Sequence, residues 1–132
     1  HNNIFDQNSV SKINLLGYAL QKIKLDPNTS LAYLVLSKEE LEKFNFQKGD
    51  SEGFVNYCLS IKGVKNAVFL REDKSLIKIS LRSKGDVKMN EFSQKYYGGG
   101  GHQNAAGAAV ESNDIDIVTK TLIENFRSFC SV

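Results

Sequence analysis

The 132-residue chain is short of the residues that cross-link a fold or anchor it in a membrane. Its two cysteines, Cys58 and Cys130, are too few for a disulfide framework, and no cysteine–histidine pair has the spacing of a zinc site. Its longest apolar runs, 31–36 and 105–110, are far shorter than the ~18 residues of a membrane-spanning helix, and no apolar segment follows a basic start as in a signal peptide. These shortages predict a soluble protein of the cytoplasm, a reducing compartment, with no membrane partner.

The chain also has little excess charge of either sign. Lysine and arginine number 17 against 15 aspartates and glutamates, which gives a net charge of +2, and the charges form no block of one sign. Only a local basic patch can therefore attract an anionic ligand. The apolar share of 41% and the charged share of 24% are those of an ordinary globular protein, and the length suits one domain of ~150 residues rather than two.

The first residues have the composition of a linker. The chain begins at His1 without an initiator methionine, and residues 2–9 are mostly polar. We therefore expect residues 1–8 to lead in from a further, N-terminal domain and residues 9–132 to form the domain itself.

Hydrophobic periodicity predicts interleaved helices and strands over residues 9–132. Helical spacing or capping signals mark five segments, and short apolar or alternating runs mark four strands. The predicted helices are 9–24, 37–44, 54–63, 90–97 and the segment after Asn113 or Asp114; the predicted strands are 31–36, 64–71, 76–82 and 105–110. This order predicts a single α/β domain with a mixed β-sheet flanked by helices.

The two central predicted strands surround a polar loop and are typical of a β-hairpin. In the second of them Lys78, Ser80 and Arg82 alternate with apolar residues and therefore share the open face of the sheet. Arg82 offers a planar fork that matches a phosphate group, and Ser83 adds a hydroxyl that would extend such an anion site. The alternative is that residues 82–85 are simply a solvated strand end.

Four consecutive glycines, Gly98–Gly101, precede His102. Backbone amides without side chains can converge on an oxyanion, and glycine tolerates the positive φ values that such a nest requires. His102 can donate a hydrogen bond and, when protonated, a positive charge. We expect the strand after His102 to share a sheet with the strand that ends at Arg82, so that both side chains reach one anion. The alternative is a flexible loop with a solvent-exposed histidine.

Catalytic groups are scarce in the sequence. Metal-assisted phosphoester hydrolysis needs several aspartate, glutamate or histidine ligands around one or two cations, yet the only histidines are His1 and His102. A serine–histidine–aspartate arrangement cannot be proposed from so few candidates. We therefore expect no catalytic residue, no metal site and no activity from this chain alone.

The segment Gly98–Gly107, with the sequence GGGGHQNAAG, resembles the GGGH-x-x-A-A-G signature of the DHH-associated C-terminal domain of DHH-family phosphoesterases. Segments 49–56 and 69–85 look like the branch of that family that degrades very short RNA and dephosphorylates pAp. The resemblance runs over nearly the whole chain, and it identifies residues 1–8 as a linker from an N-terminal DHH lobe.

The resemblance implies a two-lobed hydrolase, a phosphodiesterase or phosphatase acting on short oligoribonucleotides, dinucleotides or pAp. The DHH lobe would hold Mn²⁺ through Asp and His residues, and the present chain would hold the substrate and no cofactor. The Asp-His-His motif is absent here, so no catalytic role carries over to any residue. The implied substrate-binding residues are Arg82 and Ser83 toward phosphate, Gly99, Gly100 and Gly101 as a backbone cradle, and His102 toward the phosphate or base.

Two other readings stay open at this stage. The same domain type resembles the C-terminal part of alanyl-tRNA synthetase, where it performs no hydrolysis, which favours a nucleic-acid-binding or oligomerisation module. A relative that acts on polyphosphate shares the lobe as well. The sequence leaves open the length and base of the substrate and whether the chain forms a homodimer.

Overall fold

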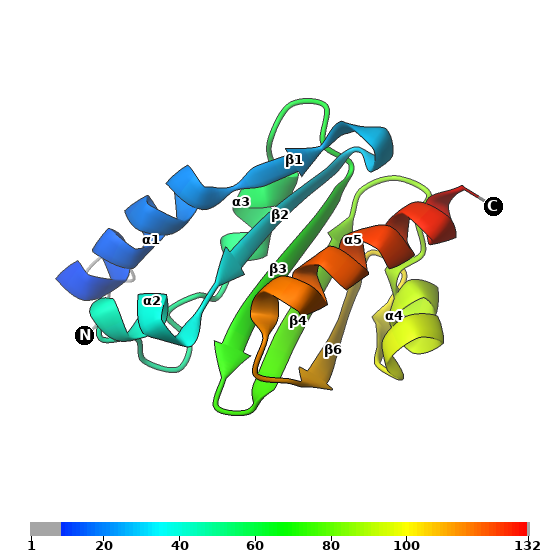
Figure 1. Ribbon diagram of the computed structural model, residues 1–132. Helices are drawn as coiled ribbons and strands as arrows, with labels where there is room; N and C mark the ends of the chain where they lie inside the picture. Colours follow the sequence, from blue (N-terminus) through cyan, green and yellow to red (C-terminus); the bar gives the residue numbers. More distant parts are fainter. Residues whose placement is uncertain (1–8, 132) are drawn as a thin grey trace.

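The computed structural model describes residues 9–131, so the predicted linker 1–8 lies outside the described residues. These residues form one mixed α/β domain, as predicted, with helices on both faces of a sheet (Figure 1). The helices are α1 Val10–Lys22, the 3-10 turn η2 Pro27–Thr29, α2 Lys38–Lys43, α3 Phe54–Leu59, α4 Met89–Tyr97 and α5 Ile115–Cys130. The strands are β1 Lys24–Asp26, β2 Leu31–Leu36, β3 Asn66–Asp73, β4 Leu76–Ser83, β5 Gly100–His102 and β6 Ala105–Glu111.

The sheet has six strands in the order β1-β2-β3-β4-β6-β5. β2 and β3 run parallel and are connected through α2 and α3, whereas all other neighbours are antiparallel. The predicted hairpin is formed by β3 and β4, with Asn66 opposite Ser83 at its open end. The predicted mixed sheet is therefore confirmed, and β5 lies at its edge.

Two apolar cores lie on the two faces of the sheet. α1, α2 and α3 cover one face over β2 and β3, and their core includes Leu15, Leu34, Phe54 and Phe69. α4 and α5 cover the opposite face, with Phe92 and Phe126 packed edge to face at its centre. Within residues 9–131, no helix is both long enough and apolar enough to cross a membrane.

Two strands differ from the sequence prediction. The predicted helix 9–24 ends at Lys22, because residues 24–26 pair with β2 as the short strand β1. Residues 100–102, expected in a glycine loop, form β5 through antiparallel pairing with β6. In both cases pairing with a neighbouring strand imposes an extended conformation on residues with no strand pattern of their own.

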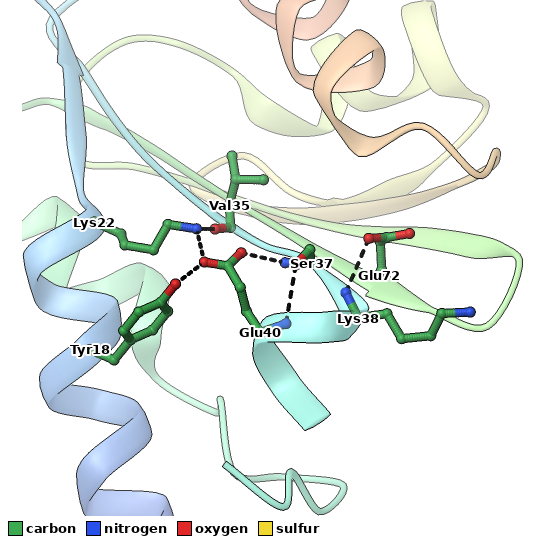
Figure 2. Close-up of polar contacts among 7 residues, drawn as sticks. All are labelled: Tyr18, Lys22, Val35, Ser37, Lys38, Glu40 and Glu72. Carbon is green, nitrogen blue, oxygen red and sulfur yellow. Dashed lines mark hydrogen bonds and ion pairs between the residues drawn. The ribbon is translucent and has the colours of Figure 1, made fainter. Parts of the chain in front are cut away.

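The carboxylate of Glu40 fastens α1 to the start of α2, as Figure 2 shows. It accepts hydrogen bonds from Tyr18 and Lys22 of α1 and, at 2.9 Å, from the Ser37 amide. Lys22 also donates to the Val35 carbonyl at 2.7 Å. Burial opposes the ionisation of Glu40, but these hydrogen bonds outweigh burial and lower its pKa to about 2.

The carboxylate of Glu40 makes the stability of the protein depend on pH. A pKa that folding lowers stabilises the protein above the ordinary value of 4.5, and this contribution disappears as the pH falls from there toward 2. The difference corresponds to at most about 3 kcal/mol. Glu40→Gln should lower the free energy of unfolding at pH 7 by about 2 kcal/mol and flatten its decline below pH 4.5. Urea unfolding at pH 3, 5 and 7 checks this, and the same pH slope in both proteins would contradict it.

Candidate functional site

Arg82 and His102 lie in one row across three strands. Arg82 of β4 is opposite Ala105 of β6, and Ala105 is in turn opposite His102 of β5. Residues directly opposite each other share a face of the sheet, and two strand spacings place the outer Cα atoms about 10 Å apart. The expectation that both residues belong to one sheet is confirmed, and an anion over Ala105 would lie between their side chains.

The surface between these two side chains consists of small residues. Ala105, Gly107 and Ala109 of β6 alternate toward this face, while Ala106, Ala108 and Val110 pack into the core beneath α4 and α5. All of β5 is exposed, and so is Ala109. Ala105, Gly107 and Ala109 therefore form a strip of small residues beside Arg82, which leaves room for an extended ligand.

Only one nitrogen of the Arg82 guanidinium donates a hydrogen bond to the described part of the chain. One nitrogen, Nη1, donates to the carbonyls of Leu81 at 2.9 Å and Ala106 at 3.4 Å. The ion pairs among residues 9–131 are Lys22–Glu40, Lys88–Glu91 and Arg127–Asp26, and none involves Arg82. The carbonyl contacts fix the side chain along the sheet, and the remaining N–H groups can bind an anion.

A cavity of about 180 Å³ adjoins Arg82 on the same face. One wall is the loop Ser51–Gly53 before α3, and the sheet side carries Arg71, Lys78 and Arg82 with Ser80 between them. Sequence reasoning placed Lys78 on the face of Arg82 but did not assign it to a site. Arg71 was missed, because only the register of the hairpin brings it opposite Lys78.

Three of the four glycines, Gly98, Gly99 and Gly101, have separate structural tasks. Gly98 ends α4 with a φ of 65°, and the Gly99 amide donates to the Ser93 carbonyl at 3.1 Å. A Cβ atom at Gly99 would lie 2.3 Å from the Gly107 carbonyl oxygen, and one at Gly101, where φ is 140°, would lie 2.5 Å from a backbone atom of β6. Gly100 has open space around it. The fold therefore requires at least three of these glycines and uses the Gly99 amide internally.

The amide of Gly101 is directed toward the open edge of the sheet. The backbone amide of Ser83 donates to the Asn104 carbonyl of the β4–β6 ladder. The backbone groups of the next residue, Ala105, therefore point the other way, toward His102 of β5. Hydrogen-bonded and non-bonded pairs alternate along antiparallel strands, which makes Gly101 a non-bonded member. Of the expected cradle of Gly99, Gly100 and Gly101, the Gly101 amide is the one that the strand pairing leaves without a backbone acceptor.

Ser83 lies on the other side of the sheet. Its side chain is buried, donates to the Val87 carbonyl at 2.8 Å and accepts from the Asn104 amide at 2.9 Å. The structure thus brings Arg82 and His102 together but not Ser83, whose hydroxyl holds the turn before α4.

Tyr96 and Tyr97 also lie away from this face. Both are half-buried against Phe92 beneath α4, on the side of the sheet opposite Arg82. Burial raises the pKa of Tyr97, whose hydroxyl accepts from Asn125. Both tyrosines therefore belong to the packing of the core face and not to the face of Arg82.

Nucleophile and metal chemistry find little support in the described chain. Cys58 is fully buried, and burial raises the pKa of its thiol to about 11, so it is a protonated core residue at neutral pH. Residues 9–131 contain no group of three or more His, Cys, Asp or Glu side chains that could hold a metal ion. The resemblance assigns its Mn²⁺ to the separate DHH lobe and not to these residues.

The chain has the architecture of an α/β domain in which the glycine run after α4 leads into the hairpin β5–β6 at the edge of a mixed sheet. The chain belongs to the DHHA1 domain family, whose model matches residues 28–128. This match confirms the resemblance indicated by the segment Gly98–Gly107.

Three relatives place the chain more closely. It is 33% identical over 114 residues to the bifunctional oligoribonuclease and PAP phosphatase NrnA of Bacillus subtilis, covering 84% of this chain and 36% of the relative. It is 37% identical over 78 residues to the NrnA of Thermus thermophilus, covering 59% of this chain and 24% of that protein. The crystal structure of an exopolyphosphatase-related protein from Bacteroides fragilis superimposes with a TM-score of 0.85 at 39% identity, covering 98% of this chain and 38% of the other. The chain thus covers between about a quarter and two fifths of the length of these relatives.

Proposed function

We propose that this chain is the substrate-holding domain of a manganese-dependent DHH phosphoesterase that hydrolyses short oligoribonucleotides, dinucleotides or pAp. Its partner in the reaction would be an N-terminal DHH lobe of the same polypeptide, which would supply the metal and the catalytic residues. Family membership and the two NrnA relatives, each a bifunctional oligoribonuclease and PAP phosphatase, support this proposal. The observation that carries it is the row formed by Arg82, Ala105 and His102 on an accessible face of the sheet.

In this proposal Arg82, His102 and the Gly101 amide each have a binding task. Arg82 donates hydrogen bonds to a phosphate and supplies its counter-charge. His102 donates to the same phosphate or to the adjacent base, and the Gly101 amide adds a neutral donor at the sheet edge. The chain itself performs no bond-breaking step; it holds the nucleotide so that the scissile phosphate meets the catalytic lobe in a fixed orientation.

The substrate panel that tests the proposal is pAp, di-adenylate and polyphosphate, each offered to the full-length protein with Mn²⁺. Hydrolysis of pAp and di-adenylate is the expected result. The second candidate function is hydrolysis of polyphosphate, which the similarity to the exopolyphosphatase-related structure supports. Hydrolysis of polyphosphate alone would favour this second function.

His102→Ala in the full-length protein should lower kcat/KM for pAp about tenfold, because one hydrogen bond to a charged phosphate is lost at ~1.5 kcal/mol. Gln103→Ala is the matched control, since Gln103 is the exposed neighbour in the same turn. The melting temperatures of both variants should stay within a few degrees of the natural protein, because both side chains are exposed. Unchanged kcat/KM in His102→Ala would remove His102 from the site.

A further inference from the structure

We propose that Arg71 and Lys78 form a second phosphate subsite, which makes the site selective for substrates longer than one nucleotide. The inference rests on the proposed function, because it takes the face of Arg82 to be the substrate face. It adds a task for two residues that the row Arg82–Ala105–His102 does not include.

The first observation is an uncompensated pair of like charges. Arg71 of β3 and Lys78 of β4 are directly opposite each other in the hairpin, and like charges in such pairs are destabilising. Neither side chain takes part in an ion pair or a side-chain hydrogen bond among residues 9–131. Two cations kept side by side without a carboxylate partner are the arrangement expected of an anion-binding site.

The second observation is the cavity that these side chains share. Arg71, Lys78 and Arg82 all line it, and Glu52 is the single carboxylate among its lining residues. Three cations against one carboxylate leave a surplus of positive charge. The guanidinium of Arg71 lies 5.2 Å from the ring centre of Phe46, a cation–π contact that orients it at the β3 end of the face.

The distance between two ends of the face, the pair Arg71–Lys78 and the row Arg82–Ala105–His102, sets the length of the ligand. Lys78 and Arg82 are four residues apart on one strand, which separates their Cα atoms by about 14 Å. His102 lies two strands beyond Arg82 and does not line the cavity. Because strand side chains stand roughly perpendicular to the sheet, the tips of His102 and Lys78 stay well apart. One phosphate cannot bind at both ends, whereas two phosphates of one oligonucleotide that are separated by two nucleosides can.

The strip of small residues between the two ends can accommodate the rest of such a ligand. Ser80 and Gly107 are opposite each other midway along it, and they present a hydroxyl and bare backbone instead of bulky side chains. The sugars and bases between the two phosphates can therefore lie over Ser80 and Gly107 while the phosphates occupy the two ends. In pAp, one of the two phosphates is the group removed, so only one remains for the present chain.

The test compares a pentanucleotide of adenylate with pAp as substrates of the full-length protein. Lys78→Ala should lower kcat/KM for the pentanucleotide about tenfold and change that for pAp less than twofold. Lys78→Arg should restore most of the loss, because it keeps the charge. The control is Lys120→Ala, which removes an exposed lysine of α5 on the opposite face. The loss should also shrink as salt rises, since a phosphate contact is screened by counterions.

Several outcomes would overturn the subsite. Equal losses on both substrates would place Lys78 at the same phosphate as Arg82, and unchanged rates on both would remove Lys78 from the site. Arg82→Ala separates this inference from the proposed function. If Arg82→Ala impairs both substrates and Lys78→Ala impairs neither, only the second subsite is wrong; if neither variant has an effect, the proposed substrate face itself is wrong.

Discussion

Replacing Arg82 by alanine in the full-length protein is expected to lower kcat/KM for pAp and for short oligoribonucleotides by about ten- to a hundredfold. A charge-assisted hydrogen bond to phosphate contributes roughly 1.5 to 3 kcal/mol, and ~1.4 kcal/mol corresponds to a factor of ten. Arg82→Lys should fall in between, because an ammonium group keeps the charge but loses the planar fork. Steady-state kinetics on both substrates measure the effect.

Stability distinguishes a binding role of Arg82 from a structural one. Its side chain is half-buried, and its protein contacts are two backbone carbonyls, so the melting temperature should change by only a few degrees. Lys24→Ala, which removes an exposed lysine on β1, serves as the control for loss of a positive charge. Unaltered kinetics together with a melting temperature lowered by many degrees would make Arg82 a structural residue.

The second large effect is expected from Gly99→Ala. The added Cβ would lie 2.3 Å from the Gly107 carbonyl oxygen and from Ser93 Oγ, and 2.8 Å from the Ala108 side chain. Real Cβ atoms do not approach backbone so closely, so α4 must move away from β6 and the Ser93–Gly107 hydrogen bond is strained. Overpacking of this kind costs about 3 kcal/mol in the free energy of unfolding.

Gly100→Ala is the matched control for this prediction. Its Cβ meets no atom within 4 Å, and its φ lies outside the left-handed region, so its stability should stay close to that of the natural protein. Urea unfolding of the two variants measures the difference. Equal stability of Gly99→Ala and Gly100→Ala would show that the glycine run is not packed against β6.

Periodicity explains which elements were predictable from the sequence. The helices around Leu15, Phe92 and Phe126 and the β3–β4 hairpin carry apolar residues at spacings that match one buried face, and all of them form. β1 and β5 are three residues long and too short for any periodic pattern. They exist because β2 and β6 offer free backbone groups, which no local signal in residues 24–26 or 100–102 reveals.

The site was predictable to the extent that alternation and motif determine it. Alternation along β4 places Arg82 on the accessible face, and the same rule places Ser83 beside Leu81 on the core face, against its expected contact with phosphate. The glycine motif located the edge hairpin but not the separate tasks of its members. The contribution of Arg71 depends on hairpin register, which the sequence alone did not specify.

The position of a bound nucleotide tests the substrate face most directly. The measurement is a crystal structure of the full-length protein with a dinucleotide whose scissile phosphate carries sulfur in place of a non-bridging oxygen, which slows its hydrolysis. The expected result is a phosphate within hydrogen-bond distance of Arg82 and His102, with the chain of the ligand lying over Ala105 and Gly107. A dinucleotide bound in the catalytic lobe with no atom on this face of the sheet would contradict the proposed function.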